Sequence, residues 1–179
     1  MVAPVSGAGR LLCDSKTVTC RVAPAERKFT VSDQAAEKTE IDASPEACFA
    51  VATDFARYTE WATDIKDVEV LAVDDTGRGG DVAFRVAAMG RSTRYTLRYS
   101  YGSNPLRMSW RLIEGDVMER IDGEYEFAPI EDGARCEARY FVSVDMLVPL
   151  PGFVKRRAEA KILHTAIEDL KRRVESVSP

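Results

Sequence analysis

The chain offers few residues that could carry acid–base or nucleophilic chemistry. His164 is the only histidine among 179 residues, so a Ser-His-Asp triad would have to use it and no histidine metal cluster can form. Its place beside Leu163 in a helical pattern favours a structural side chain. The glycines of residues 77–80 lie between two strand-like runs rather than before a helix, so they do not form a phosphate loop. The sequence therefore predicts no catalytic residue and no cofactor.

The cysteines do not indicate a metal site either. Cys13, Cys20, Cys48 and Cys136 contain no Cys-x-x-Cys pair and have no histidine cluster near them. Cys48 and Cys136 fall at predicted core positions, where cysteine acts as a small hydrophobic residue. The pattern predicts no metal and a reduced, cytoplasmic protein.

A more informative set of side chains is aromatic or apolar and recurs on one face of the predicted strands. Tyr and Trp combine a large contact area with a polar atom that needs a partner, so several of them together are typical of a small-molecule site. The same residues could instead fill a solid core, and the sequence leaves both interpretations open. The candidate ligand-binding residues are Phe84, Tyr95, Leu97, Tyr99, Met108, Trp110, Tyr125, Tyr140, Leu163 and Ile167. Tyr58 and Trp61 are candidates for the cavity mouth, or for an anchor that holds short helices on the sheet.

The elements that must position these side chains follow from local patterns. A strand is expected over residues 37–41. Ser44 is a candidate N-cap before Pro45 at the first helical position, and Asp54 is a candidate cap for a second short helix. The period then changes to two in six successive runs joined by turns, which predicts an antiparallel sheet. These runs are residues 68–72, 82–88, 93–101, 106–112, 121–127 and 136–146.

One long element remains to cover the apolar face of such a sheet. Residues 151–174 form an amphipathic helix pattern. The positions expected to face the sheet are Phe153, Ala160, Leu163, Ile167, Leu170 and Val174. The order of elements predicts an α+β helix-grip fold, with a curved antiparallel sheet of six to seven strands around a long C-terminal helix and two short helices after the first strand.

Composition and charge limit the partners. The net charge is −4 and the pI is about 5.2, which does not favour nucleic acid. No apolar run reaches the roughly 18–20 residues of a membrane span, although the basic closing helix is either a solvated face or a surface for transient contact with an acidic membrane or partner. Residues 1–31 are expected to be a disordered extension and residues 32–179 a ligand-binding domain, as a monomer or weak dimer.

Four segments carry a resemblance to a known family: residues 41–46, 54–61, 108–112 and 144–149. They resemble the START-like SRPBCC superfamily, within it the actinobacterial polyketide cyclase/dehydrase and coenzyme-Q-binding-type group. The resemblance implies a START/Bet v-like helix-grip fold with a deep apolar cavity between the sheet and the last helix. It implies binding or carriage of a lipid, quinone or polyketide-like molecule. The alternatives are a polyketide aromatase/cyclase or dehydratase, in which Tyr95, Tyr99 and Tyr125 would orient the substrate, and a protein-interaction module.

Overall fold

The computed structural model describes residues 35–88, 91–148 and 151–178, so the predicted extension over residues 1–31 lies outside the described residues. The elements in chain order are β1 (Ala35–Ile41), α1 (Pro45–Thr53), η1 (Phe55–Arg57), α2 (Tyr58–Trp61), β2 (Ile65–Val73), β3 (Gly79–Ala88), β4 (Arg91–Ser103), β5 (Leu106–Gly115), β6 (Met118–Ile130), η2 (Glu131–Gly133), β7 (Arg135–Met146) and α3 (Gly152–Val177). The predicted strands and the long closing helix are all present.

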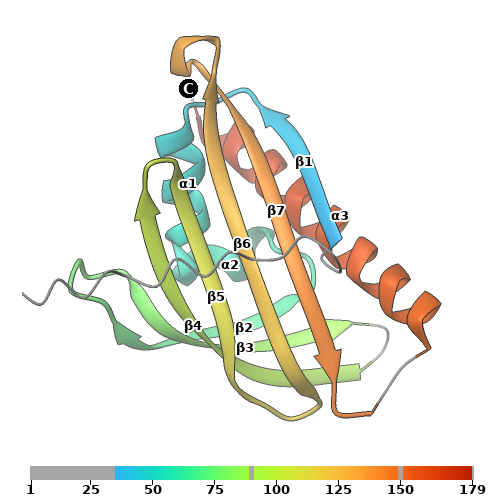
Figure 1. Cartoon of the computed structure of the whole chain (residues 1–179). Helices are drawn as coiled ribbons and strands as arrows, with labels where there is room; N and C mark the ends of the chain where they lie inside the picture. The colour runs from blue at the N-terminus through green and yellow to red at the C-terminus, as the bar shows by residue number, and fades with distance from the viewer. Residues whose placement is uncertain (1–34, 89–90, 149–150, 179) are drawn as a thin grey trace, which may run out of the picture. The chain divides into compact units, whose positions relative to one another are not determined.

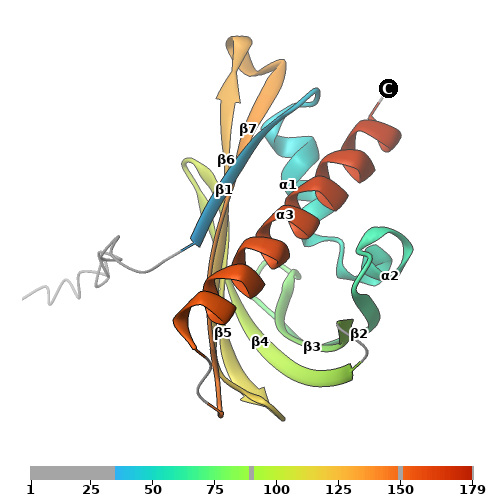
Figure 2. The same ribbon diagram turned by 90° about the vertical axis from the view of Figure 1, so that its right-hand side faces the viewer.

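The seven strands form one antiparallel sheet in the order β1-β7-β6-β5-β4-β3-β2. Strands β2 to β7 lie in the sheet in the same order as in the chain, because short turns join each strand to the next. Strand β1 pairs with β7, at the edge of the sheet opposite β2. The sheet is strongly curved, and α1, α2 and α3 all lie on its concave side (Figures 1 and 2). This arrangement is the predicted helix-grip fold.

The helix starts follow local chemistry. The Ser44 hydroxyl accepts a hydrogen bond from the Ala47 backbone N–H at 3.3 Å, and Pro45 occupies the first turn, as predicted. Asp54 stands before the next helical turn, but its side chain makes no capping hydrogen bond, so its role as a side-chain cap was wrongly predicted. None of the helices in the described residues combines the length and the apolar character needed to cross a bilayer.

The long helix α3 turns a different face to the sheet over its first half than the sequence predicts. Leu163, Ile167, Leu170 and Val174 are buried as expected, but Phe153 is 69% exposed. Ala160 is also exposed, and the adjacent Glu159 is buried instead. Glu159 is buried there because a backbone N–H group of the sheet needs a hydrogen-bond acceptor.

That backbone group is the Val144 N–H of β7. Within the described residues, β1 pairs with β7 only as far as Val142. The Glu159 carboxylate accepts a hydrogen bond from the Val144 N–H at 3.1 Å and so satisfies this donor. This half-buried donor gains its hydrogen-bond partner because Glu159, rather than Ala160, faces the sheet.

The edge strand β2 departs from regular alternation. Its pairing with β3 has three register irregularities, and Val70 and Val73 are 42% and 63% exposed. Bulges of this kind twist an edge strand away from further pairing. The expected apolar face therefore ends near Val68, which is only partly buried.

Candidate ligand cavity

A partly open hollow of about 240 Å³ lies between the concave face of the sheet and α3. Its wall is mostly apolar and aromatic and comes from β2 to β7, α2, the α2–β2 connection and α3. Of the residues predicted to bind a ligand or to form the mouth, those that line it are Tyr58, Trp61, Phe84, Tyr95, Leu97, Tyr99, Met108, Trp110, Tyr125 and Tyr140.

The floor of the cavity is a continuous layer of aromatic rings. Tyr125 on β6 and Tyr140 on β7 face each other in register and stack with ring centroids 4.3 Å apart. Trp110 on β5 lies 5.6 Å from both rings. Its indole lies across Gly123, its partner on β6, and a Cβ at position 123 would overlap that ring. Glycine at this position therefore allows Trp110 to lie close to the sheet.

Four tyrosine hydroxyls in this layer have no protein partner within the part of the chain that the structure describes. They belong to Tyr95, Tyr99, Tyr125 and Tyr140. Burial raises the pKa of each phenol above its ordinary value, so all four stay neutral at physiological pH. A neutral phenol both donates and accepts. The cavity thus combines an apolar surface with several hydroxyls free to bind oxygen atoms of a guest.

The mouth of the cavity lies between the α2–β2 connection and the middle of α3, where the lining residues Thr63 and Ile162 are exposed. Asp169 on α3 is 4% exposed, and its Oδ2 accepts the Thr63 backbone N–H at 2.8 Å. Its Oδ1 accepts a hydrogen bond from Arg172 at 3.1 Å. Because both oxygens are engaged, Asp169 holds the connection against the helix.

Tyr58 and Trp61 occupy different places at this mouth. The Tyr58 hydroxyl donates to the Ala52 carbonyl at 2.5 Å, which fixes α2 on α1, while its ring lines the cavity. The Trp61 ring packs on Tyr58 with centroids 4.8 Å apart. Its Nε1–H is buried and has no hydrogen-bond partner among the described residues. Buried donors are rarely left unpaired, so this atom is a further contact point for a bound molecule or water.

Leu163 and Ile167 were predicted to line the cavity, but the structure places both elsewhere. They are 2% and 0% exposed and belong to the core. The face of α3 that borders the cavity instead carries Ile162, Thr165, Ala166 and Asp169. The apolar pattern identifies the most buried stripe of a helix, and here that stripe lies beside the cavity wall rather than on it.

The only histidine of the chain lies away from the cavity. His164 is on the exposed side of α3, with its Nδ1 3.0 Å from Glu37 Oε1 of β1. This carboxylate raises the pKa of the imidazole. The residue cannot reach a molecule in the cavity and acts as a surface link between α3 and β1.

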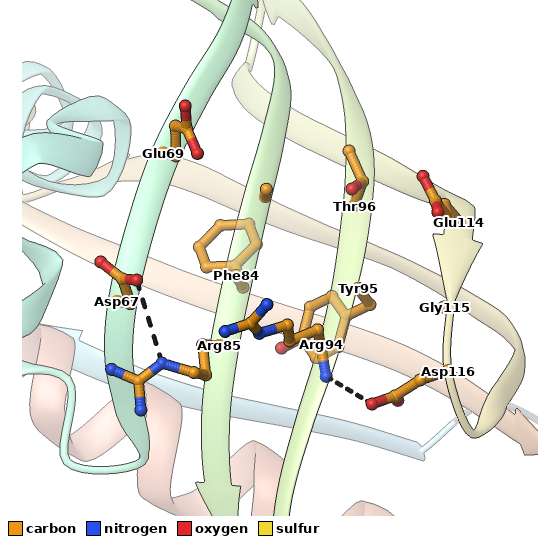
Figure 3. A pocket seen from close by; sticks show the side chains of 11 residues that line it. Asp67, Glu69, Phe84, Arg85, Arg94, Tyr95, Thr96, Glu114, Gly115 and Asp116 are labelled. Atoms are coloured by element: carbon orange, nitrogen blue, oxygen red, sulfur yellow. Dashed lines mark hydrogen bonds and ion pairs between the residues drawn. The ribbon is translucent and has the colours of Figure 1, made fainter.

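A second hollow, of about 450 Å³, lies on the outer face of β2 to β5 (Figure 3). Its walls carry charged side chains, with Arg85 Nε 3.9 Å from Asp67 Oδ2 and the Arg94 backbone N–H donating to Asp116 at 3.0 Å. The hydrogen bond from Thr93 is the main cause of a lowered pKa at Asp116. The Phe84 and Tyr95 rings lie behind the strands and do not cover it. This open groove, in which Asp67 pairs with Arg85 and Asp116 accepts from Thr93 and the Arg94 backbone, has the character of ordinary protein surface.

A family model described as "Polyketide cyclase / dehydrase and lipid transport" matches residues 27–175. No curated protein matches the chain. A START superfamily protein from Mycobacterium smegmatis has a similar structure, with 22% identity and a TM-score of 0.76 over 81% of this chain and 99% of that one. The Zhui aromatase/cyclase from Streptomyces sp. R1128 is also similar, with 14% identity and a TM-score of 0.68 over 80% and 93% of the two chains.

A third similar structure is a STAR-related lipid transfer protein from Xanthomonas axonopodis. It shares 15% identity with a TM-score of 0.59 over 79% of this chain and 85% of that one. At these identities the likeness concerns the fold, and the names of the similar proteins span both lipid transfer and ring formation.

Proposed function

Because the chain belongs to the polyketide cyclase/dehydrase and lipid transport family, we propose that it binds a small apolar molecule with oxygen substituents between the sheet and α3. The observation that carries the proposal is the layer of aromatic rings whose four tyrosine hydroxyls have no protein partner among the described residues. Rings stack on such a surface, and carbonyl or hydroxyl groups of the guest would pair with the phenols.

The size of the cavity narrows the class of ligand. Its volume of about 240 Å³ lies just below the range of about 300–1,000 Å³ that is typical of sites for drug-sized ligands. A lipid with two long acyl chains is much larger than that. A compound of two or three fused rings, such as a phenolic or quinone-like polyketide, matches both the volume and the aromatic wall.

The proposal is tested first on the protein as purified. Native mass spectrometry gives the mass of any bound molecule, and denaturing extraction followed by mass and absorbance analysis identifies it. We expect a stoichiometric ring compound, or, from empty protein, uptake of an added hydroxylated anthraquinone. A diacyl lipid as the only bound molecule would contradict the ring-compound proposal, and failure to take up either class would contradict ligand binding altogether.

Ring closure of a bound polyketide is a second candidate function, favoured by the same hydroxyls. In an aldol condensation, a C–C bond forms between an enol carbon and a carbonyl carbon, the enol oxygen loses its proton and becomes a carbonyl oxygen, the attacked carbonyl oxygen gains a proton, and water is lost in the aromatising step. Tyr95, Tyr99 and Tyr125 would hold the chain and donate to the carbonyl oxygen. Turnover of a poly-β-ketone surrogate, with loss of turnover in Tyr125→Phe, would support this function. Tight binding without turnover would leave the carrier role.

A further inference from the structure

Exposed apolar side chains gather where β7 passes to α3. Val148, Phe153 and Leu147 are 70%, 69% and 59% exposed, and are three of the four most exposed large apolar residues in the described part of the chain. Val117, 40% exposed, joins them because its carbonyl accepts the Leu147 N–H at 3.1 Å. The end of β7 and the start of α3 lie at the same end of the fold (Figures 1 and 2). Clustered apolar exposure of this kind marks an interaction surface.

Cations flank this apolar group on α3. Arg156, Arg157 and Lys161 are exposed and have no acidic partner within the described residues, whereas the nearby Lys155 is paired with Asp145 at 2.6 Å. Counted from Phe153, they lie three, four and eight positions further on, which places all four side chains on one outward face of the helix. We call Val117, Leu147, Val148, Phe153, Arg156, Arg157 and Lys161 together the apolar–basic tip.

We propose that the apolar–basic tip docks onto the surface of an anionic lipid bilayer. Apolar side chains enter the boundary between headgroups and acyl chains, while unpaired cations pair with anionic headgroups. If the partner were a second copy of the chain, its unpaired cations would face the unpaired cations of the first copy. Like charges across an interface are unfavourable. Charge complementarity therefore favours an anionic surface over a second copy, and the exposed apolar side chains beside the cations match the acyl chains of a bilayer.

The test is flotation of the full chain with phosphatidylcholine vesicles that contain either no anionic lipid or roughly 30% phosphatidylglycerol. We expect binding to the anionic vesicles, weakened by salt. Each Arg near such a surface contributes about five-fold to the partition coefficient, so R156Q/R157Q should lower it about 25-fold. Phe153→Ser should lower it about ten-fold through loss of the inserted ring.

The matched control is R94Q/R111Q, which removes two exposed arginines on the outer face of the sheet that have no acidic partner in the described residues. It should bind the anionic vesicles like the unaltered chain. The proposal is overturned if anionic lipid gives no added binding, or if R156Q/R157Q behaves like this control. It is also overturned if light scattering shows a dimer that Phe153→Ser dissociates, since the partner would then be a second copy. Anthraquinone uptake by R156Q/R157Q is measured separately. It distinguishes a variant that no longer docks on the vesicles from one that no longer binds the ligand.

Discussion

The concave face of the sheet has a dense region and a hollow region, and one strand takes part in both. Phe127 and Tyr125 lie two residues apart on the same face of β6, and their rings stack with centroids 5.8 Å apart. Phe127 is fully buried and packs edge-on against Phe49 of α1 at 6.2 Å. Tyr125 borders the cavity. The strand pattern is identical, so the difference comes from the helices above it.

The helix side chains explain this difference. Over the dense region, α1 supplies Cys48 and Phe49 and α3 supplies Leu170 and Val174, all buried. Over the hollow region, α3 presents Thr165, Ala166 and Asp169, with Ile162 as the one large apolar side chain. The cavity is therefore made by short residues on the helix opposite large rings on the sheet. It follows that the two regions should respond differently to substitution.

The largest contrast should appear on truncation in the dense region. Phe127→Ala would leave a hole that neighbours cannot fill and should lower the free energy of unfolding by about 3–5 kcal/mol. Tyr125→Phe, the control on the same strand, should change it by less than about 1 kcal/mol because the ring remains and the lost hydroxyl has no protein partner. Urea denaturation measures both. Similar losses in the two variants would mean that the regions are equally packed.

Filling the hollow region should affect binding rather than stability. Ala166→Phe points a ring into the cavity and should weaken binding of anilinonaphthalene sulfonate or an added anthraquinone by at least about 100-fold, through steric exclusion. The free energy of unfolding should stay the same or rise, as for other cavity-filling changes. Ala160→Phe adds the same ring on the exposed side of α3 and is the control. Unchanged affinity in Ala166→Phe would place the ligand elsewhere.

The sequence predicted much of this fold because the sheet obeys period two from β3 to β7, and Ser44-Pro45 marks a helix start. It could not predict where the hollow region lies, since Phe127 and Tyr125 fall on the same alternation. Glu159 and Asp169 were missed because hydrophobic patterns treat acids as exposed. Their burial depends on unpaired N–H groups in β7 and the α2–β2 connection, which exist only in the folded chain.

The two regions should also lose stability in different alkaline ranges. In the dense region, the contact with the Cys136 thiol and burial raise the pKa of Cys48 from 9.0. In the hollow region, burial raises the pKa of tyrosines such as Tyr140 from 10.0. Above the unfolded pKa of each group, the unfolded chain releases the proton while the folded chain keeps it. Each group's contribution to the free energy of unfolding is therefore intact below its unfolded pKa. It falls by up to about 1.4 kcal/mol per pH unit above that value.

Urea denaturation from about pH 8 to about pH 11 tests these ranges. Cys48→Ala should reduce the loss that begins near pH 9.0, and Tyr140→Phe the loss that begins near pH 10.0. Tyrosinate absorbance of the folded protein reports the second group directly. If the cavity tyrosines ionise near pH 10.0 while the chain is folded, the cavity is filled with water and the contrast between the regions is one of hydration.

The smallest expected effect is the loss of a single tyrosine hydroxyl. It distinguishes hydroxyls available to a ligand from those that already form a hydrogen bond within the protein. Tyr140→Phe should weaken binding of an oxygen-bearing ring compound by about 1 kcal/mol, or five-fold, and leave binding of the matching hydrocarbon unchanged. Tyr101 is the control, because its hydroxyl donates to the Gly79 carbonyl at 2.5 Å and it does not line the cavity. Tyr101→Phe should lower the free energy of unfolding by about 1 kcal/mol without changing affinity. Equal loss of both ligands in Tyr140→Phe would show that the ring, not the hydroxyl, makes the contact, and the hollow region would then be an apolar site without preference for oxygen.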